Sequence, residues 1–293
     1  MTTTGTVSPA SPAPHLPGGL SVGPVTLGVT DLARSTAFYT QGLGLRVLHS
    51  TPDRVTLGVP ARPLLTLNAR PGRPAPPSSP GLYHLALLLP TRADLGRFVR
   101  HMAGLGARLG QGDHLVSEAL YLNDPDGHGI EVYRDRPRSE WTWHGTQVEM
   151  DSRPVDIQGL LREAGPDAPY AGLPDGTVMG HVHLRVTDLA ATEAFYAGVL
   201  GFDIVSRFSG QALFVSAGGY HHHLGLNTWQ SLGGTRAPAG SAQLERATLV
   251  LPDAADLDAL AARLAAAGVS HERDDAGLHV QDPAGNPLLF TLA

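Results

Sequence analysis

Cysteine is absent from the 293-residue chain, so disulfide bonds and thiolate metal sites are excluded. Charged residues make up only 16% of the sequence, and the net charge is −6 with no basic run, which argues against a nucleic-acid partner. No apolar stretch approaches the roughly 18 residues of a membrane-spanning helix. Any metal site must therefore use histidine, carboxylate or water, and we expect a cytoplasmic protein with no membrane partner.

Residues 1–19 are mostly Thr, Ser, Pro and Gly, and they contain neither the basic nor the apolar region of a signal peptide. We expect this segment to be a disordered tail. The rest of the chain is long enough for one large or two medium domains. Its hydrophobic content, 42% over the whole sequence, allows a sizeable core.

The chain repeats itself, and the clearest repeat has a constant offset of 157 residues, which relates Asp31 to Asp188. Residues 23–39 recur as 180–196, and 88–95 resembles 250–257. Alternating apolar residues predict a strand at the start of each of four modules, followed by a capped helix and about three short strands. The order βαβββ, four times over, predicts an α+β fold. The modules are 23–70, 81–135, 178–229 and 243–293, with helices at 31–41, 92–105, 188–199 and 254–267.

Two stretches divide these modules. Residues 71–80 are so rich in proline that they predict an extended connector. Residues 136–177 are polar and rich in Pro, Gly and Asp, and they predict a linker with one short helix around 156–164. We therefore expect two domains, 20–135 and 178–293.

The segment 112–131 places His114, Tyr121 and Glu131 along two predicted strands that a tight turn at 124–127 joins. Apolar residues alternate with polar ones, so Tyr121, Glu131 and Tyr133 should leave the strands on the face opposite the apolar packing. A carboxylate near a tyrosine and a histidine indicates a metal site with polar surroundings. A polar hairpin on the surface is the alternative.

Histidine occurs at matching positions of the first strand in only two modules. Counting back seven residues from Asp31, Thr91, Asp188 and Asp253, which lie at or just before the start of the predicted helices, reaches Pro24, His84, His181 and Arg246. The last strand of module two supplies Glu131, whereas module four has Leu289 at the matching position. If modules two and three pair, one barrel holds His84, His181 and Glu131, and modules one and four form a structural barrel. Two histidines and one carboxylate leave three faces of an octahedral ion open, as in non-heme Fe(II) oxygenases.

Other histidines of the sequence could also be metal ligands or catalytic residues. His183 lies two residues from His181 on the same side of the strand, so it is the alternate ligand. Each histidine could instead be a hydrogen-bonded residue lining a polar cavity. The triplet 221–223 is predicted to lie inside a strand of module three, where one member would be catalytic, although a surface metal-scavenging cluster would have the same sequence. The residues that we expect to line the pocket are His183, His223 and Asn227.

The segment 112–131 resembles the signature of the bacterial catechol-2,3-dioxygenase-like type I extradiol dioxygenases of the vicinal oxygen chelate (glyoxalase/bleomycin resistance/dioxygenase) superfamily. That signature is Gly-x-His, five residues, Leu-Tyr, two residues, Asp-Pro-x-Gly, three residues and Glu, and every constrained position matches. The resemblance implies two vicinal-oxygen-chelate barrels with Glu131 as the metal carboxylate. It also implies that His114 and Tyr121 contact substrate or dioxygen intermediates, and that His222, in a His-x-Leu-Gly context, is the acid–base residue.

The family resemblance implies an Fe(II) cofactor, with Mn(II) or another divalent metal as the alternative. The implied partners are a catechol-type aromatic diol and dioxygen, with a homo-oligomer of unspecified size as a further expectation, and the implied role is in aromatic catabolism. One departure is that the signature lies in the second module, whereas in the best-known members it lies in the last. Here the last module ends Asn286-Pro-Leu-Leu-Phe without the glutamate.

Three hypotheses follow. The first is an Fe(II)-dependent extradiol ring-cleavage dioxygenase. The second is a metal-dependent glyoxalase-like lyase or isomerase of the same superfamily, which usually takes a carboxylate from each module. Only Glu131 is visible here, and this counts against it. The third is a protein that binds a small aromatic molecule or confers resistance to one. Such a protein needs no metal cage.

Overall fold

The computed structural model describes residues 15–166 and 169–293. Most of the predicted tail, residues 1–14, lies outside this part of the chain. The prediction of disorder is wrong for residues 15–19, because Leu16 is buried in the core and its backbone N–H donates to the carbonyl of Gly201. One apolar side chain is enough to attach this otherwise polar segment to the folded body.

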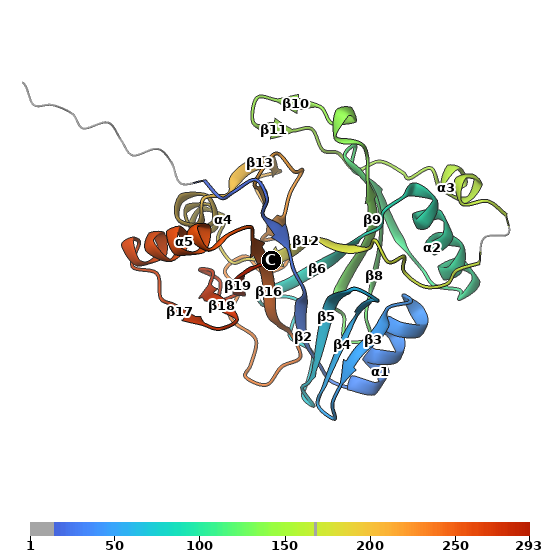
Figure 1. Cartoon of the computed structure of the whole chain (residues 1–293), viewed down its shortest axis with the longest axis horizontal. Helices are drawn as coiled ribbons and strands as arrows, with labels where there is room; N and C mark the ends of the chain where they lie inside the picture. The colour runs from blue at the N-terminus through green and yellow to red at the C-terminus, as the bar shows by residue number, and fades with distance from the viewer. Residues whose placement is uncertain (1–14, 167–168) are drawn as a thin grey trace, which may run out of the picture.

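Two curled sheets form the centre of the molecule, as the α+β prediction required (Figure 1). The first has the order β17-β18-β19-β16-β2-β5-β4-β3, with β1 paired to β16. Its strands are β1 Ser21–Val22, β2 Val25–Val29, β3 Arg46–Ser50, β4 Arg54–Val59, β5 Arg62–Ala69, β16 Leu244–Leu251, β17 His271–Asp274, β18 Gly277–Gln281 and β19 Pro287–Leu292.

The second sheet has the order β13-β14-β15-β12-β6-β9-β8-β7. Its strands are β6 Gly81–Leu88, β7 Gly110–Asp113, β8 Ser117–Asn123, β9 Gly129–Asp135, β12 Val178–Arg185, β13 Asp203–Phe208, β14 Ala212–Ser216 and β15 Leu224–Asn227. Modules two and three therefore share one sheet, and modules one and four share the other. This is the pairing that the ligand pattern predicted, and each half of the sequence contributes strands to both sheets.

The helices lie on the outside of the sheets (Figure 1), and all four predicted module helices are present. The side chains of Asp31, Thr91, Asp188 and Asp253 each accept a hydrogen bond from a backbone N–H in the first helical turn, as N-caps do. The helices are α1 Leu32–Ala37, α2 Arg92–Gly104, α3 Ile157–Ala164, α4 Leu189–Glu193 and α5 Ala254–Ala266, with π-helical turns η1 Phe38–Gly42 and η3 Ala194–Leu200 and a 3-10 turn η2 Arg138–Glu140.

The repeated Asp-Pro-x-Gly turns tie neighbouring modules together. The fully buried Tyr39 donates from its hydroxyl to Asp124 Oδ2 at 3.1 Å, and the equivalent Tyr196 donates to Asp282 Oδ2 at the same distance. Each aspartate also caps its own turn by accepting backbone N–H groups. The repeat therefore preserves one buried polar contact in each half of the chain, because an unpaired hydroxyl there would cost free energy.

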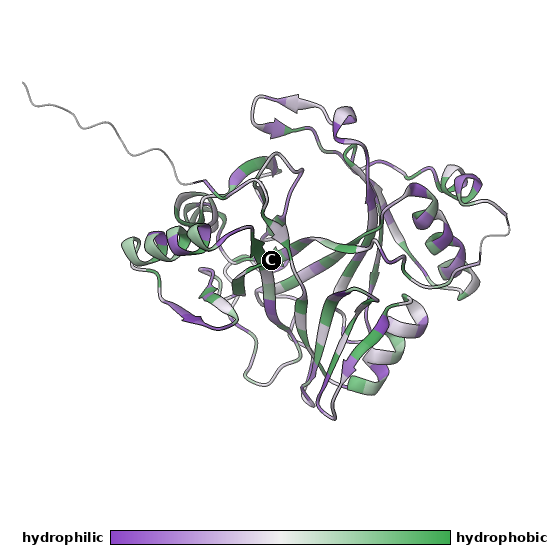
Figure 2. Cartoon of the chain, in the orientation of Figure 1, coloured by the Kyte–Doolittle hydropathy of each residue, from purple (hydrophilic) through white to green (hydrophobic). Residues whose placement is uncertain are grey.

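The core is continuous between the two sheets. One buried cluster includes Leu27 of the first sheet and Leu85 and Val182 of the second. Hydrophobic and hydrophilic residues alternate along several strands (Figure 2), the pattern of a sheet with one apolar and one polar face. Because Leu85, Leu87 and Val182 point into the core, their neighbours His84 and His181 point to the opposite, concave face.

The segment 136–177 contains more structure than a linker. The predicted short helix is present as α3, and a small hairpin forms from β10 Trp143–His144 and β11 Gln147–Val148. Trp141 and Val148 are buried against Tyr220 of module three, so this segment packs on the second sheet. Residues 71–80 are irregular apart from one bridge to the chain near Ala242. No helix in the described ranges has the length and apolar character needed to span a membrane.

Candidate metal centre and cavity

Three central strands of the second sheet bring the predicted ligands together. Parallel pairing of β6 with β9 sets Ala86 opposite Glu131, and antiparallel pairing of β6 with β12 sets Ala86 opposite His181. The small side chain of Ala86 leaves the space above it to Glu131 and His181, and His84 lies two residues earlier on the same face of β6. The register of the sheet therefore positions all three groups.

The ligand atoms of these residues are close to one another and buried. The Nε2 atoms of His84 and His181 lie 3.0 and 3.1 Å from the same oxygen, Glu131 Oε2, and 3.4 Å from each other. Donor atoms about 2.1 Å from an ion, on adjacent corners of an octahedron, are separated by about 3.0 Å. The three ligand atoms therefore fit one triangular face of an octahedral coordination shell around a divalent metal. The opposite face of that shell would be open to the cavity.

Electrostatics favours an ionised Glu131 and a neutral His84, two of the protonation states that metal binding requires. Burial alone would raise the pKa of Glu131, but the charge on His181 and hydrogen bonds from His181 and His84 outweigh it and hold that pKa well below its usual value. Burial lowers the pKa of His84, although the hydrogen bond to Glu131 partly opposes this shift. An ionised carboxylate beside a neutral imidazole is the form that coordinates a metal.

His183, the alternate ligand, is buried next to this cluster but is not part of it. Its ring packs edge-on against His84 at 4.9 Å and against Tyr83 at 5.0 Å between centroids. Its Nε2 is buried without a hydrogen-bond partner in the described chain. Burial, followed by the charges of His84 and His181, lowers the pKa of His183 well below the usual value. The geometry therefore favours His181 as the ligand and His183 as part of the cavity wall.

A cavity of about 900 Å³ opens over the cluster, and modules two and three both contribute residues to its walls. His84, Glu131 and His181 lie at its base. Phe214 and Trp229 supply an aromatic wall, and Phe208, half exposed, lies at the rim. The volume is ample for a small aromatic molecule with a substituent.

His114 and Tyr121 form a hydrogen-bonded pair beside the metal cluster, and both line the cavity. His114 Nδ1 lies 2.8 Å from the backbone oxygen of Asp151, and His114 Nε2 lies 2.7 Å from the Tyr121 hydroxyl. Because a carbonyl can only accept, Nδ1 of His114 donates to it, and in the neutral form of the ring the Tyr121 hydroxyl donates to Nε2. Burial and the charge of Glu131 raise the pKa of Tyr121 well above its usual value, so the phenol is neutral.

His222 lines the cavity on the side of module three, with its ring centroid 4.2 Å from that of His181. Burial, followed by the charges of His181 and His221, lowers the pKa of His222 well below its usual value. The prediction that the triplet lies inside a strand is wrong, because β15 begins only at Leu224. Residues 221–223 form an irregular turn before β15, so neighbouring side chains need not point to opposite faces.

Two of the predicted pocket residues lie outside the cavity lining. His223 is buried on another side of the turn, where its Nδ1 is 3.1 Å from the Ser216 hydroxyl and 3.3 Å from the backbone nitrogen of Ala217. Asn227 is fully buried, and its side-chain oxygen accepts the backbone N–H of Trp229. Both side chains therefore form hydrogen bonds with nearby residues of the chain and do not face the cavity. His183 is the member of the predicted set that lines the cavity.

Part of the cavity wall was not predicted from the sequence. Met150, Asp151 and Ser152 line it, although they belong to the segment predicted as a linker. No local pattern marks them, because their position depends on a bridge between Asp113 and Arg153. Tyr83 also lines the cavity beside its neighbour His84, since a bulge in β6 at this point interrupts the alternation of side chains.

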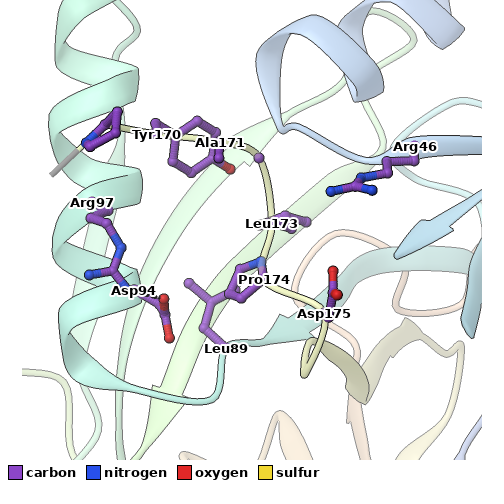
Figure 3. Close-up of a pocket in the computed structure, with 11 residues that line it drawn as sticks. Arg46, Leu89, Asp94, Arg97, Tyr170, Ala171, Leu173, Pro174 and Asp175 are labelled. Carbon is purple, nitrogen blue, oxygen red and sulfur yellow. Dashed lines mark hydrogen bonds and ion pairs between the residues drawn. The ribbon is translucent and has the colours of Figure 1, made fainter. Parts of the chain in front are cut away.

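A second, smaller cavity of about 220 Å³ lies between α2 and the chain at 169–175 and shares no lining residue with the first. Figure 3 shows Arg46, Asp94 and Arg97 around it. Asp94 already forms an ion pair with Arg97 and a hydrogen bond with Thr91. None of its lining residues in the described part of the chain is a histidine, and it is separate from the metal cluster.

The absence of a side chain at Gly180 leaves room for Tyr133, which packs against His181. A Cβ at Gly180 would overlap the hydroxyl of the fully buried Tyr133, whose ring packs on His181 at 4.8 Å. We expect Gly180→Ala to lower the free energy of unfolding by about 1–3 kcal/mol, the usual cost of overpacking. Chemical denaturation measures this change. The control is Gly198→Ala, which meets no atom within 4 Å and should leave stability unchanged or slightly raised; equal stability of the two variants would contradict the prediction.

Repeated βαβββ modules and a buried His–Glu–His cluster define a vicinal-oxygen-chelate protein whose site could hold a divalent metal. The model of the Glyoxalase/Bleomycin resistance protein/Dioxygenase superfamily matches residues 21–132 and 178–290, and the chain belongs to this family. The chain is 46% identical over 274 residues to a catechol-2,3-dioxygenase of Bacillus subtilis (strain 168), a match that covers 92% of this chain and 95% of that protein.

Two further similarities are more limited. A biphenyl-2,3-diol 1,2-dioxygenase of Sphingomonas paucimobilis is 31% identical over 121 residues, which is 38% of this chain and 37% of that protein. The crystal structure of glyoxalase I from Zea mays superimposes with a TM-score of 0.55 at 16% identity, covering 93% of this chain and 92% of that one. The structural match supports the fold alone.

Proposed function

We propose that this protein is an Fe(II)-dependent extradiol dioxygenase that opens the ring of a catechol-type aromatic diol with O₂. One observation carries the proposal: two histidine nitrogens and one carboxylate oxygen lie 3.0–3.4 Å apart at the base of a large cavity. The similarity to the Bacillus catechol-2,3-dioxygenase over most of both chains supports this reaction over the other chemistries of the superfamily.

His84, His181 and Glu131 would hold the metal. A ferrous ion there would lower the pKa of a chelating diol and leave an adjacent position for O₂. The remaining roles belong to the chain itself. The buried neutral His222 would accept a proton from one substrate hydroxyl, and the O–H bond would break as the N–H bond forms.

On the other side of the cavity, the His114–Tyr121 pair would orient the substrate oxygens. Tyr121 is neutral and donates its proton to His114, so its oxygen can accept a hydrogen bond from a substrate hydroxyl, and His114 is held in a single tautomer by the Asp151 carbonyl. The aromatic wall of Phe214 and Trp229 would exclude water and pack against the diol ring. In the overall reaction both atoms of O₂ enter the product, a semialdehyde acid, so no external reductant is required.

The proposal is tested by anaerobic reconstitution of the full chain with Fe(II), followed by oxygen uptake and absorbance measurements with a panel of catechols. We expect one O₂ consumed per diol and a yellow product. One bound metal without oxygen uptake would contradict the dioxygenase and favour the lyase or isomerase hypothesis. A chain that binds no metal but binds an aromatic molecule at micromolar concentration would instead favour the binding-protein hypothesis.

A further inference from the structure

We propose that Asp135 and His221 form a positioning pair that holds His222 in the tautomer with Nδ1 protonated, so that Nε2 is free to accept a proton in the cavity. The kinetic consequence rests on the proposed dioxygenase function, whereas the tautomer itself does not. Asp135 and His221 are neither members of the cluster of metal ligands nor residues of the cavity lining. They would therefore act through His222.

A short chain of hydrogen bonds connects the three residues. His221 Nε2 lies 2.8 Å from Asp135 Oδ1, and His221 Nδ1 lies 2.8 Å from His222 Nδ1. His221 is fully buried, and its ring packs against Tyr220 at 4.1 Å and Trp141 at 5.2 Å. The ring cannot turn without losing both hydrogen bonds and this packing, so its orientation is fixed.

The tautomers follow from what each atom can donate or accept. The carboxylate of Asp135 can only accept, so His221 carries its proton on Nε2. With its proton on Nε2, the neutral form of His221 is an acceptor at Nδ1, and His222 then donates from its own Nδ1 to fill the 2.8 Å contact. Neutral His222 therefore has an unprotonated Nε2, and His222 is the member of this chain that lines the cavity.

The backbone explains how adjacent residues can make this contact. In a regular strand, consecutive side chains point to opposite faces, and the rings of His221 and His222 would separate. Residues 221–223 are not in a strand, so the two rings meet with their centroids 4.7 Å apart. Asp135 reaches the pair from β9, four residues after Glu131 and on the same face of that strand.

The arrangement also provides a route for the proton. When His222 Nε2 takes the proton of a substrate hydroxyl, the Nδ1 proton of His222 can pass to His221 Nδ1. The positive charge then resides on His221, 2.8 Å from the Asp135 carboxylate, and farther from the metal cluster, because the ring centroid of His181 lies 6.1 Å from that of His221 and 4.2 Å from that of His222. Return of the proton reverses both transfers, so no proton is gained or lost by the protein over the cycle.

The tautomers can be observed directly by ¹⁵N NMR of histidine-labelled full-length protein loaded with diamagnetic Zn(II), with His222→Gln used to assign its signals. We expect His221 protonated on Nε2 and His222 protonated on Nδ1. In His221→Phe, which keeps an aromatic ring between Tyr220 and Trp141, His222 should lose the Nδ1-protonated form. A wild-type His222 protonated on Nε2, or an unchanged His222 in His221→Phe, would overturn the proposal.

The kinetic test uses Asp135→Asn, which has nearly the same shape but no charge to stabilise protonated His221. We expect kcat with catechol to fall by about 10²-fold or more, within the range of general acid–base catalysis, with KM within about threefold and metal content unchanged. The matched control is Asp274→Asn, because Asp274 accepts from His279 at 3.0 Å in an exposed hairpin of the other sheet. A fall in kcat of less than threefold in Asp135→Asn would contradict the proposal.

The two proposals fail in different ways. If the wild-type protein turns over no catechol, the proposed function fails, but the tautomers of His221 and His222 can still be read from the NMR spectra. If the wild type is active and Asp135→Asn is equally active, only the positioning pair is refuted. If Asp135→Asn does not fold, the NMR spectra of His221→Phe and its turnover rate with catechol test the positioning pair instead.

Discussion

Glu131→Ala is expected to lose its metal and its activity together. Glu131 supplies the single negative charge of the cluster, and its Oε2 is within 3.1 Å of both histidine nitrogens. Without it, a divalent ion would be held by two neutral rings alone. We expect metal affinity to fall by more than about 100-fold, beyond the usual effect of changing an outer-shell partner, and catechol turnover to become undetectable at micromolar Fe(II).

Metal content, measured by elemental analysis after desalting, checks this prediction without reference to activity. Thermal unfolding provides a second measurement, because a metal at 100 times its Kd stabilises the wild-type fold by about 2.7 kcal/mol and should not stabilise the variant. The control is Glu272→Ala, an exposed glutamate on β17 of the other sheet. A Glu131→Ala protein with full metal content and normal oxygen uptake would refute the assigned site.

The paired variants His181→Ala and His183→Ala are expected to differ sharply. Both side chains are buried on the same face of β12, but only His181 places Nε2 within 3.1 Å of Glu131. His181→Ala should therefore lose metal as Glu131→Ala does. His183→Ala should keep its metal within about tenfold of the wild-type affinity, because it removes a wall of the cavity and no ligand, and it should mainly change KM.

Metal titration of both proteins, with oxygen uptake at saturating Fe(II), measures the difference. Each variant serves as the control of the other, since both delete a buried imidazole from the same strand. Retention of metal by His181→Ala with loss by His183→Ala would show that the alternate ligand is the true one. Circular dichroism of both proteins confirms that each remains folded.

The elements of the fold were predictable because their signals are local. The N-caps Asp31, Thr91, Asp188 and Asp253, and the repetition of similar segments in the two halves, defined the module helices to within a few residues. Pairing of modules two and three was also predictable, since only that pairing collects His84, His181 and Glu131 in one sheet. The prediction for residues 15–19 failed because burial of Leu16 depends on a distant surface.

The conformation of the histidine triplet could not be predicted from the sequence. A strand through 221–223 would separate His221 from His222, whereas the actual turn joins them and sends His223 to Ser216. Asp135 could have been noticed, because it follows Glu131 by four residues on the same face of β9. Its partner could not, since His221 lies 86 residues away along the chain.

The sequence by itself determined the repeated βαβββ modules, the signature from Gly112 to Glu131 and the types of donor available for a metal, because these depend on short-range periodicity and on residue identity. Only the tertiary structure decided that Ala86 lies between Glu131 and His181, that His183 faces the cavity and not the carboxylate, and that residues 150–152 close the pocket. Those facts depend on strand register and on long-range packing, where a shift of one residue moves every side chain to the opposite face.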